Sequence, residues 1–228
     1  RKYRNQYRKR IFPSETLNQN MDSPFLFEIQ INNQMQELKE KHIELIARTI
    51  TAENKNDFVK WNVSFPEGQR PELDWLLNNG FLTGYYIVKD KQQIPCAATF
   101  SDIIFNSCFF LFWLAVFPEF RDYGIGSQIL KFLYRKASGM NCRMYFLIED
   151  PYQENATETE VIQRMKRLSF YERNGFHFTK NIKYTGSGIH FWIGTKDGMI
   201  SASEADTLSN LAQEHLNNII EKENNHIE

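Results

Sequence analysis

The chain has 228 residues, 42% of them hydrophobic and 14% aromatic, so it can bury a full core and is compatible with one domain. Its formal net charge is −1, which argues against attraction of the whole surface to nucleic acid or to an anionic membrane. The apolar runs are too short to cross a bilayer, and neither a signal peptide nor an internal repeat is recognisable.

The cysteines and histidines do not form a disulfide or metal-binding pattern. The three cysteines are an odd number, contain no CxxC pair and lie partly in strand-like apolar runs. We therefore expect buried thiols in a reducing compartment and place the protein in the cytoplasm. The five histidines are scattered without ligand spacing, so no metal site is expected.

Residues 1–24 predict an arm outside the folded domain. Residues 1–10 hold six basic side chains and show no apolar periodicity. We expect a solvated, mobile tail; an arm that binds nucleic acid or membrane is the weaker alternative. A domain over residues 25–196 and an amphipathic helix over residues 201–222 complete the predicted organisation.

The first part of the domain predicts a strand, a helix and an irregular stretch. Residues 25–31 alternate partially and predict a strand. The apolar positions of residues 35–49 recur at helical spacing and predict a helix. Residues 51–80 are irregular, rich in aromatic side chains and interrupted by proline and glycine.

The middle of the chain predicts a mixed sheet. Strands over residues 81–88, 95–104 and 109–117 are joined by polar hairpins into an antiparallel meander. The next connection carries a helix over residues 125–137 and returns at residues 143–148, a right-handed crossover between parallel strands. Helices should therefore cover the faces of this sheet.

The last part predicts a helix, a hairpin and a final helix. The first helix covers residues 158–173, and the hairpin joins strands over residues 178–184 and 189–193. Ser203 is the expected N-cap of the final helix, whose apolar side chains form one stripe. The stripe packs either on the domain or on a second subunit, which makes a homodimer a candidate assembly.

The turn after residues 109–117 has the chemistry of an anion site. Gly124 and Gly126 remove side chains that would keep a ligand from the backbone, and the following helix offers unpaired N–H groups and the positive end of its dipole. Arg121 adds a guanidinium for the same anion, and Ser127 adds a hydroxyl. Arg-x-x-Gly-x-Gly alone is a weak signal, because such a turn can be purely structural.

A second motif makes the interpretation specific. Residues 164–176 predict a helix that ends at Asn174 and Gly175, with a strand starting at Phe176. Together the two stretches resemble the GNAT superfamily of acyl-CoA-dependent N-acetyltransferases, over about residues 25–195. The family's cofactor motif and its Phe-Tyr-x-x-x-Gly-Phe signature fall on Arg121, Gly124 and Gly126, and on Phe170, Tyr171, Gly175 and Phe176.

The resemblance implies the GNAT fold, a mixed and mostly antiparallel sheet of about six to seven strands with helices on both faces. It also implies that the central parallel strands splay apart, so that the pantetheine arm of acetyl-CoA lies between them like an added strand. The implied cofactor residues are Leu114, Ala115, Val116, Arg121, Asp122, Tyr123, Gly124, Ile125, Gly126, Ser127 and Asn155. Asp122 and Tyr123 replace small or basic residues of the family, which predicts a less cationic pyrophosphate pocket; an ordinary loop asparagine is the alternative for Asn155.

Acetyl transfer to an amine needs a proton acceptor for the amine and a proton donor for the leaving thiolate. The resemblance implies that Tyr171 lies near the thioester sulfur, where a phenol with a pKa near ~10 stays protonated at pH 7 and can donate. Glu149 ends a predicted strand and is the candidate base, with a solvated strand end as the equal alternative. For Tyr171 the alternative is an ordinary core tyrosine.

The acceptor pocket is expected from segments that border it in the resembled family, the first two helices and the final hairpin. We expect it to be formed by the aromatic residues Trp61, Phe65, Trp75 and Tyr184. The alternative for the first three is that they only fill the core.

The sequence thus predicts an N-acetyltransferase that moves an acetyl group from acetyl-CoA to a primary amine of a small molecule or peptide by direct attack. The alternative is a catalytically silent acyl-CoA-binding or regulatory module, in which the cofactor site persists without acceptor chemistry.

Overall fold

The computed structural model describes most of the chain from residue 25 onward. The described residues are 25–29, 43–61, 63–65, 72–77, 79–89, 91–105, 107–154, 156–183 and 190–224, so the predicted basic arm lies outside them. The chain divides into two compact units, and each is considered by itself below. The first unit is Arg1–Thr99 with Leu114–Gln128, and the second is Phe100–Trp113 with Ile129–Glu228.

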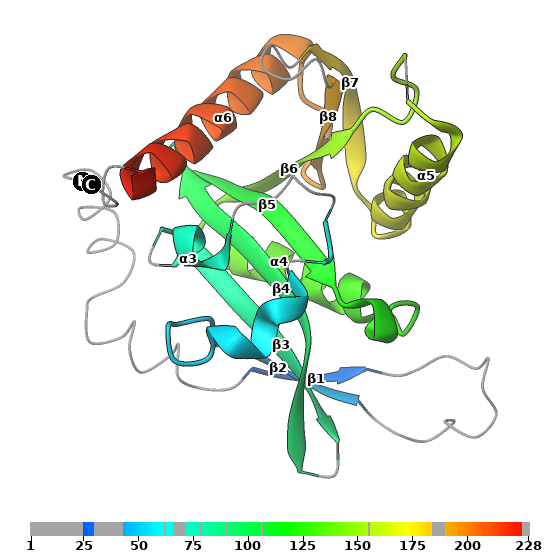
Figure 1. Ribbon diagram of the computed structural model, residues 1–228. Coiled ribbons are helices and arrows are strands. Elements are labelled where there is room, and N and C mark those ends of the chain that lie inside the picture. The colour runs from blue at the N-terminus through cyan, green and yellow to red at the C-terminus, as the bar shows by residue number, and fades with distance from the viewer. Residues whose placement is uncertain are drawn as a thin grey trace. The chain divides into compact units, whose positions relative to one another are not determined.

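The elements follow one another along the chain as labelled in Figure 1. They are β1 (Phe25–Ile29), β2 (Ile43–Thr49), η1 (Lys55–Trp61), α3 (Leu73–Leu76), β3 (Phe81–Lys89), β4 (Gln92–Ile104), β5 (Cys108–Val116), η2 (Pro118–Phe120), α4 (Ile125–Gly139), β6 (Arg143–Glu149), α5 (Glu158–Arg173), β7 (His177–Lys183), β8 (His190–Thr195) and α6 (Ala202–Asn224).

The strands form a mixed sheet, which confirms the predicted fold class. Among the described residues, hydrogen-bonded neighbours follow the order β1-β2-β3-β4-β5-β6-β8-β7, which makes eight strands where about six to seven were predicted. β5 and β6 are parallel, whereas β1 with β2, β2 with β3, β6 with β8 and β7 with β8 are antiparallel.

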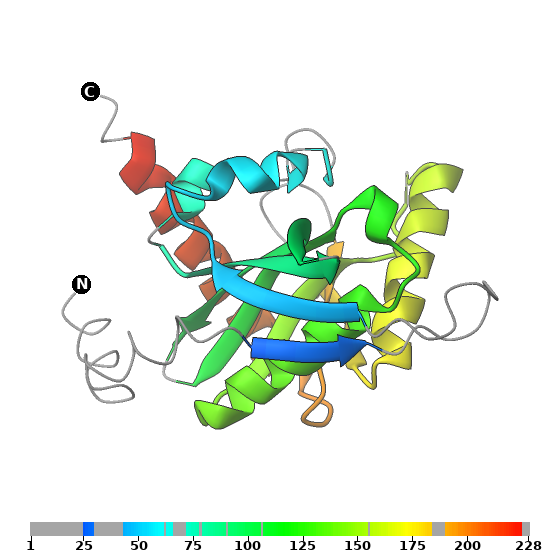
Figure 2. The same ribbon diagram turned by 90° about the horizontal axis from the view of Figure 1, so that it is seen from below.

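One predicted element is wrong: residues 43–49 form strand β2, not the second half of a helix. β2 pairs with β1 on one side and with β3 on the other, as Figure 2 shows for β1 and β2. Leu45, Ile46 and Ala47 are consecutive and all buried, which a strand covered on both faces permits and a single helix face does not. The rest of the predicted helix, residues 35–42, lies outside the described residues.

The core of the first unit is aromatic and centres on η1 and β3. Phe58 and Trp61 of η1 are both fully buried. The Phe58 ring meets Tyr86 of β3 edge-on, with ring centroids 5.3 Å apart. The irregular aromatic stretch of the sequence therefore covers β3 with a short helical turn.

The second unit places α5 beside β6 and α6 beside β7. The apolar stripe of α6 contributes Ala205, Leu208 and Ala212 to a cluster that also holds Phe110 of β5 and Tyr145 of β6. The final helix therefore packs on the domain, which was one of its two expected roles. Its capping residue differs from the expected one, because the Glu204 N–H donates to Oγ of Ser201 at 3.1 Å and makes Ser201 the cap in place of Ser203.

The parallel pair opens toward its carboxyl end within the second unit. The ladder joins Cys108–Leu111 of β5 to Arg143–Phe146 of β6. β6 continues to Glu149 and pairs on its other edge with β8 from Tyr145 to Glu149, whereas the ladder with β5 stops at Phe146. The predicted divergence of the two parallel strands therefore begins after Leu111 and Phe146.

Within the described part of the chain, no helix is long and apolar enough to span a bilayer. The same residues contain no cluster of three or more side chains suited to hold a metal ion. Cys96, Cys108 and Cys142 are free thiols.

Candidate functional site

The first unit turns the chain sharply at the end of β5. Phe117 is buried, and its N–H donates to the carbonyl of Cys96 at 2.9 Å. Pro118 then opens η2, where its fixed φ suits the first helical position, and the Phe120 N–H donates to the Phe117 carbonyl at 2.9 Å. The turn that follows therefore starts from an anchored base.

Two residues of this turn have left-handed backbone. Asp122 has φ of +67° and Gly124 has φ of +74°. Asp tolerates this region, whereas at Gly124 the absent Cβ removes the steric cost altogether. A Cβ added at Gly124 would meet no atom within 4 Å, so the glycine is required by its backbone angle and the space beside it is open.

Helix α4 begins directly after this turn. The Gln128 N–H donates to the Gly124 carbonyl at 3.2 Å, which closes the first helical turn. The N–H groups of Ile125, Gly126 and Ser127 precede that bond and have no carbonyl to meet inside the helix. Backbone donors in this arrangement, at the positive end of the helix dipole, can bind a phosphate-like anion.

Arg121 and Glu119 are held by partners within the first unit. The exposed Arg121 donates from Nε to the Val116 carbonyl at 3.1 Å, so this carbonyl already has one partner. Glu119 contacts the ammonium of Lys60 on η1, and this hydrogen bond lowers the pKa of the Glu119 carboxyl. The Arg121 guanidinium therefore folds back on the end of β5, and its two Nη atoms take no part in the hydrogen bond to Val116.

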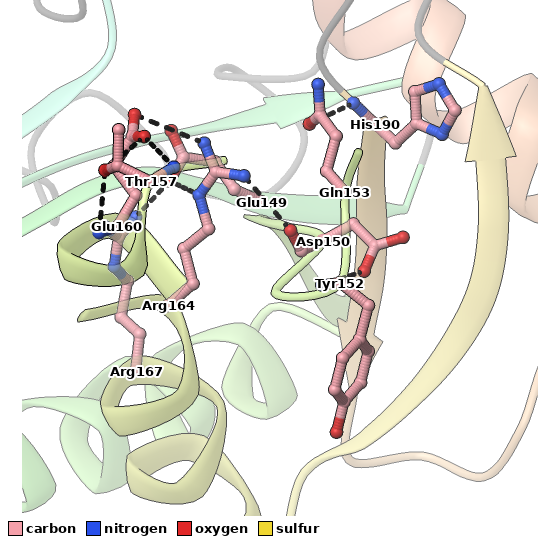
Figure 3. Close-up of polar contacts among 9 residues, drawn as sticks. All are labelled: Glu149, Asp150, Tyr152, Gln153, Thr157, Glu160, Arg164, Arg167 and His190. Atoms are coloured by element: carbon pink, nitrogen blue, oxygen red, sulfur yellow. Dashed lines mark hydrogen bonds and ion pairs between the residues drawn. The ribbon is translucent and has the colours of Figure 1, made fainter. Parts of the chain in front are cut away.

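Glu149, the predicted base, lies in the second unit as the last residue of β6. Its carboxylate is 8% exposed, so it is not a solvated strand end. Oε2 lies 3.2 Å from Arg164 Nε and 3.3 Å from Arg167 Nη1 (Figure 3). Two guanidiniums from α5 therefore share one oxygen of this carboxylate.

Arg164 ties the end of β6 to the start of α5. The side chain is 6% exposed, and its Nη1 donates to the Asp150 carbonyl at 3.2 Å. Nη2 lies 3.8 Å from Oε1 of Glu160 (Figure 3). The buried guanidinium thus forms ion pairs with two carboxylates and donates one hydrogen bond, to the Asp150 carbonyl, and these contacts fix the chain on both sides of the loop.

The start of α5 is a capping box. The Thr157 N–H donates to Glu160 Oε2 at 2.8 Å, and the Glu160 N–H donates to Thr157 Oγ1 at 3.3 Å. Since Glu160 also faces Arg164, the cap and the Glu149 network form one polar cluster (Figure 3).

The loop between β6 and α5 is fixed against β8. The Asp150 N–H donates to the His190 carbonyl at 2.8 Å, and the His190 N–H donates to Gln153 Oε1 at 3.1 Å. Asp150 Oδ1 accepts from the Tyr152 N–H at 2.8 Å, which closes a turn at Asp150 and Pro151 (Figure 3). The side chain of Tyr152 remains exposed.

Tyr171 is buried on α5 in an aromatic setting. Its ring lies over Phe146 of β6, with centroids 4.2 Å apart. Burial raises the pKa of its phenol to about 12, and the positive charge of Arg167 opposes this rise. The phenol is therefore protonated at neutral pH. The helix ends as predicted, with Gly175 in the left-handed region at φ of +81°.

The predicted acceptor residues differ in burial. Trp61 is 0% exposed and packs against Phe65 with ring centroids 5.0 Å apart, which favours the alternative that Trp61 fills the core. Phe65 and Trp75 are partly exposed. Asn155 and Tyr184 lie outside the described residues.

The sequence interpretation missed the two arginine partners of Glu149. Their pairing is a tertiary contact that no local pattern reveals. The capping box had a readable signal, since Thr157 and Glu160 stand at the required spacing before a helix. The i,i+4 spacing of Glu160 and Arg164 is a second local signal, because it predicts contact between these two side chains on one helix.

Comparison with known proteins gives one family match. Residues 82–178 match the model of the acetyltransferase (GNAT) domain, a span that includes both the turn after β5 and the helix end at Gly175. No curated protein matches the sequence.

Several solved structures are similar to this chain at low identity. Naa50 of Arabidopsis thaliana, solved with a bisubstrate analogue, is 15% identical, with a TM-score of 0.48 over 66% of this chain and 97% of its own. A GNAT family acetyltransferase of Elizabethkingia anophelis with bound acetyl-CoA is 14% identical, with a TM-score of 0.47 over 66% of this chain and 96% of its own. The ribosomal-protein-S18-alanine N-acetyltransferase of Escherichia coli is 14% identical, with a TM-score of 0.45 over 66% of this chain and 91% of its own.

Proposed function

We propose that the protein transfers an acetyl group from acetyl-CoA to a primary amine of a small molecule or peptide, because residues 82–178 match the model of the acetyltransferase (GNAT) domain. The observation that carries this proposal is the turn at the start of α4, where left-handed backbone at Gly124 leads directly into the unpaired N–H groups of a helix.

The turn is assigned to the pyrophosphate of acetyl-CoA. Gly124, Ile125, Gly126 and Ser127 offer backbone donors, and Arg121 adds a cation beside them. Asp122 and Tyr123 complete the turn. The main chain of Leu114, Ala115 and Val116 is assigned to the pantetheine amides. The Val116 carbonyl already accepts a hydrogen bond from Arg121, so it would accept the pantetheine amide with its second lone pair. Asn155 stays a prediction for the same arm.

The reaction is a direct acyl transfer. The amine nitrogen attacks the thioester carbon, the C–S bond breaks, and the amine loses one proton while the departing thiolate gains one. We assign the donated proton to Tyr171, since its phenol is protonated at neutral pH and lies in a dry aromatic setting. The phenolate then recovers a proton and the base that accepted the amine proton releases one, so the protein ends the cycle unchanged.

Glu149 is assigned as the acceptor of the amine proton, directly or through water. Arg164 and Arg167 both contact Oε2 of Glu149. We therefore assign the amine proton to the other oxygen, Oε1. The exposed acidic side chains of Glu154 and Glu158 follow Glu149 in the chain and favour a cationic acceptor. Phe65, Trp75 and Tyr184 stay predictions for the acceptor pocket, and Trp61 supports it from the core.

The proposal is tested by thiol release from acetyl-CoA. We expect free CoA to appear only when an amine is present, and Tyr171→Phe to slow its release by roughly 10²- to 10⁴-fold, the usual contribution of a general acid. Tyr134→Phe is the matched control, because this phenol donates to Asp197 on the protein surface and has no assigned role.

A catalytically silent CoA-binding module is the rival function. It predicts that CoA binds tightly while no amine in a broad panel is acetylated, and that result would replace the enzyme assignment. The three free thiols fit a reducing compartment, so we keep the cytoplasm as the proposed location. A homodimer also stays a proposal.

A further inference from the structure

The two arginines that hold Glu149 differ in how much of each guanidinium is already engaged. Arg164 is 6% exposed and meets the Glu149 carboxylate, the Asp150 carbonyl and Glu160. Arg167 is 43% exposed and reaches Glu149 through Nη1. Arg164 is therefore a buried structural link, whereas Arg167 keeps much of its guanidinium in solvent.

Arg167 also lies one helical turn before Tyr171. Residues at i and i+4 are neighbours on a helix surface, with Cβ atoms about 5–6 Å apart. The ring contacts of Tyr171 are with apolar residues, Phe146, Phe170, Phe176 and Phe178. Among the described residues, the charge of Arg167 acts on this phenol and opposes the rise in pKa that burial causes.

The Arg167 guanidinium thus acts on both Glu149 and Tyr171, the two residues to which the proton transfers are assigned. It contacts the Glu149 carboxylate at 3.3 Å, and its charge favours the phenolate form of Tyr171. A positive charge beside a phenol that gives up its proton stabilises the negative charge that develops there, and a partly dry site strengthens the effect. Arg164 cannot replace it, because its nitrogens are engaged with the β6 end and the capping box.

We propose, resting on the function proposed above, that Arg167 is a positioning residue of the acetyl transfer, which holds the Glu149 carboxylate in place and stabilises the Tyr171 phenolate as it forms. The phenol proton passes to the CoA sulfur, and the guanidinium remains protonated throughout.

The test compares Arg167→Gln and Arg167→Lys with Lys166→Gln, which removes an exposed cation from the same helix. We expect Arg167→Gln to lower kcat by about 10- to 100-fold without raising KM for acetyl-CoA. Arg167→Lys keeps the charge and should restore most of kcat, and Lys166→Gln should leave it unchanged.

A second readout follows the phenol itself in the full-length protein. The tyrosines are labelled with ring-fluorinated tyrosine, which titrates at lower pH than tyrosine, and the signal of residue 171 is identified by its loss in Tyr171→Phe. Fluorine NMR should show this phenol titrating at higher pH in Arg167→Gln than in the wild type, and at an unchanged pH in Lys166→Gln.

Each outcome decides the proposal. A lower kcat together with a raised titration midpoint supports it. An unmoved midpoint, or a wild-type kcat in Arg167→Gln, overturns it while the acetyltransferase assignment stands. A wild type that turns over no amine overturns the proposed function, and the role of Arg167 falls with it. Circular dichroism shows whether Arg167→Gln is folded. If it is unfolded, the kcat of Arg167→Lys and the titration of the Tyr171 phenol in that variant decide the proposal.

Discussion

Phe58 fills space that a side chain at position 84 would need. A Cβ added at Gly84 would stand 2.0 Å from Cζ of Phe58, and the ring is fully buried with no exposed side to withdraw to. Gly139 is the opposite case, because a Cβ there would meet no atom within 4 Å. Packing against Phe58 therefore requires a glycine at position 84, whereas position 139 has room for a side chain.

We expect Gly84→Ala to lower the free energy of unfolding by about 1–3 kcal/mol, the usual cost of overpacking a filled core. Gly139→Ala at the end of α4 should leave stability unchanged or raise it by up to about 1 kcal/mol, since it only restricts the unfolded chain. Urea unfolding of both variants measures the difference. Equal effects would show that Phe58 has room to move.

Single residues were predictable from the sequence where their role is local. Gly124 and Gly175 could be placed because each ends or begins a helix with backbone that glycine adopts most easily, and both have positive φ. The contact of Glu149 with Arg164 and Arg167 joins a strand to a helix and has no local signature. The sequence could therefore nominate Glu149 but not its neutralising partners.

Among the elements, α5 and β2 show when helix and strand can be predicted. Helix α5 has the predicted bounds, because Thr157 caps its start and Gly175 follows its end. In β2 the apolar residues happened to continue a helical spacing from residues 35–42, and the pattern alone did not reveal that β3 would pair with it. Long-range pairing overrode the local period there.

Helix α6 illustrates how an element outside the matched domain span becomes part of the core. Its side chains Ala205, Leu208 and Ala212 are all buried against the second unit. We expect Leu208→Ala to lower the free energy of unfolding by about 2–5 kcal/mol, the range for a buried leucine. Asn210→Ala, on an exposed position of the same helix, should cost less than about 0.5 kcal/mol.

Chemical denaturation of the two variants measures this difference. If Leu208→Ala were as stable as Asn210→Ala, α6 would not be packed on the domain, and its apolar stripe would become available for a second subunit.

At the scale of the whole molecule, burial raises the pKa of several phenols and of one thiol. It raises the pKa of the phenols of Tyr86, Tyr145 and Tyr171 from 10.0 to about 12, and that of Tyr85 further. It also raises the pKa of the Cys96 thiol from 9.0 to about 12. Lys136 is the opposite case, because burial lowers its pKa from 10.5 to about 8.

These shifts predict a loss of stability at alkaline pH. Below about pH 8 the phenols and the thiol are protonated in both states and add no pH dependence. The unfolded chain loses the thiol proton around pH 9 and the phenol protons around pH 10, while the folded chain keeps them, so these five groups lower the free energy of unfolding as pH rises toward 12. Lys136 acts in the opposite sense between about pH 8 and 10.5, where the unfolded chain keeps the extra proton; it outweighs the acids below about pH 9, and the five acids outweigh it above about pH 9.5.

Urea unfolding between about pH 9.5 and 11 measures the slope, and Tyr145→Phe should make it shallower above about pH 10 by removing one buried phenol. A free energy of unfolding that stays constant or rises across this range would contradict the burial of these groups.

The central claim, that the turn at the start of α4 binds acetyl-CoA, is tested most directly by thermal unfolding with and without this ligand. The comparison uses the wild type, Gly126→Trp, whose side chain would block the approach of a pyrophosphate to the backbone, and Gly139→Trp at the other end of the helix as the matched control. We expect acetyl-CoA to stabilise the wild type and Gly139→Trp by about 2.7 kcal/mol at a hundredfold excess over Kd, and to leave Gly126→Trp unchanged. No stabilisation of the wild type at saturating ligand, or an equal shift in Gly126→Trp, would contradict the claim.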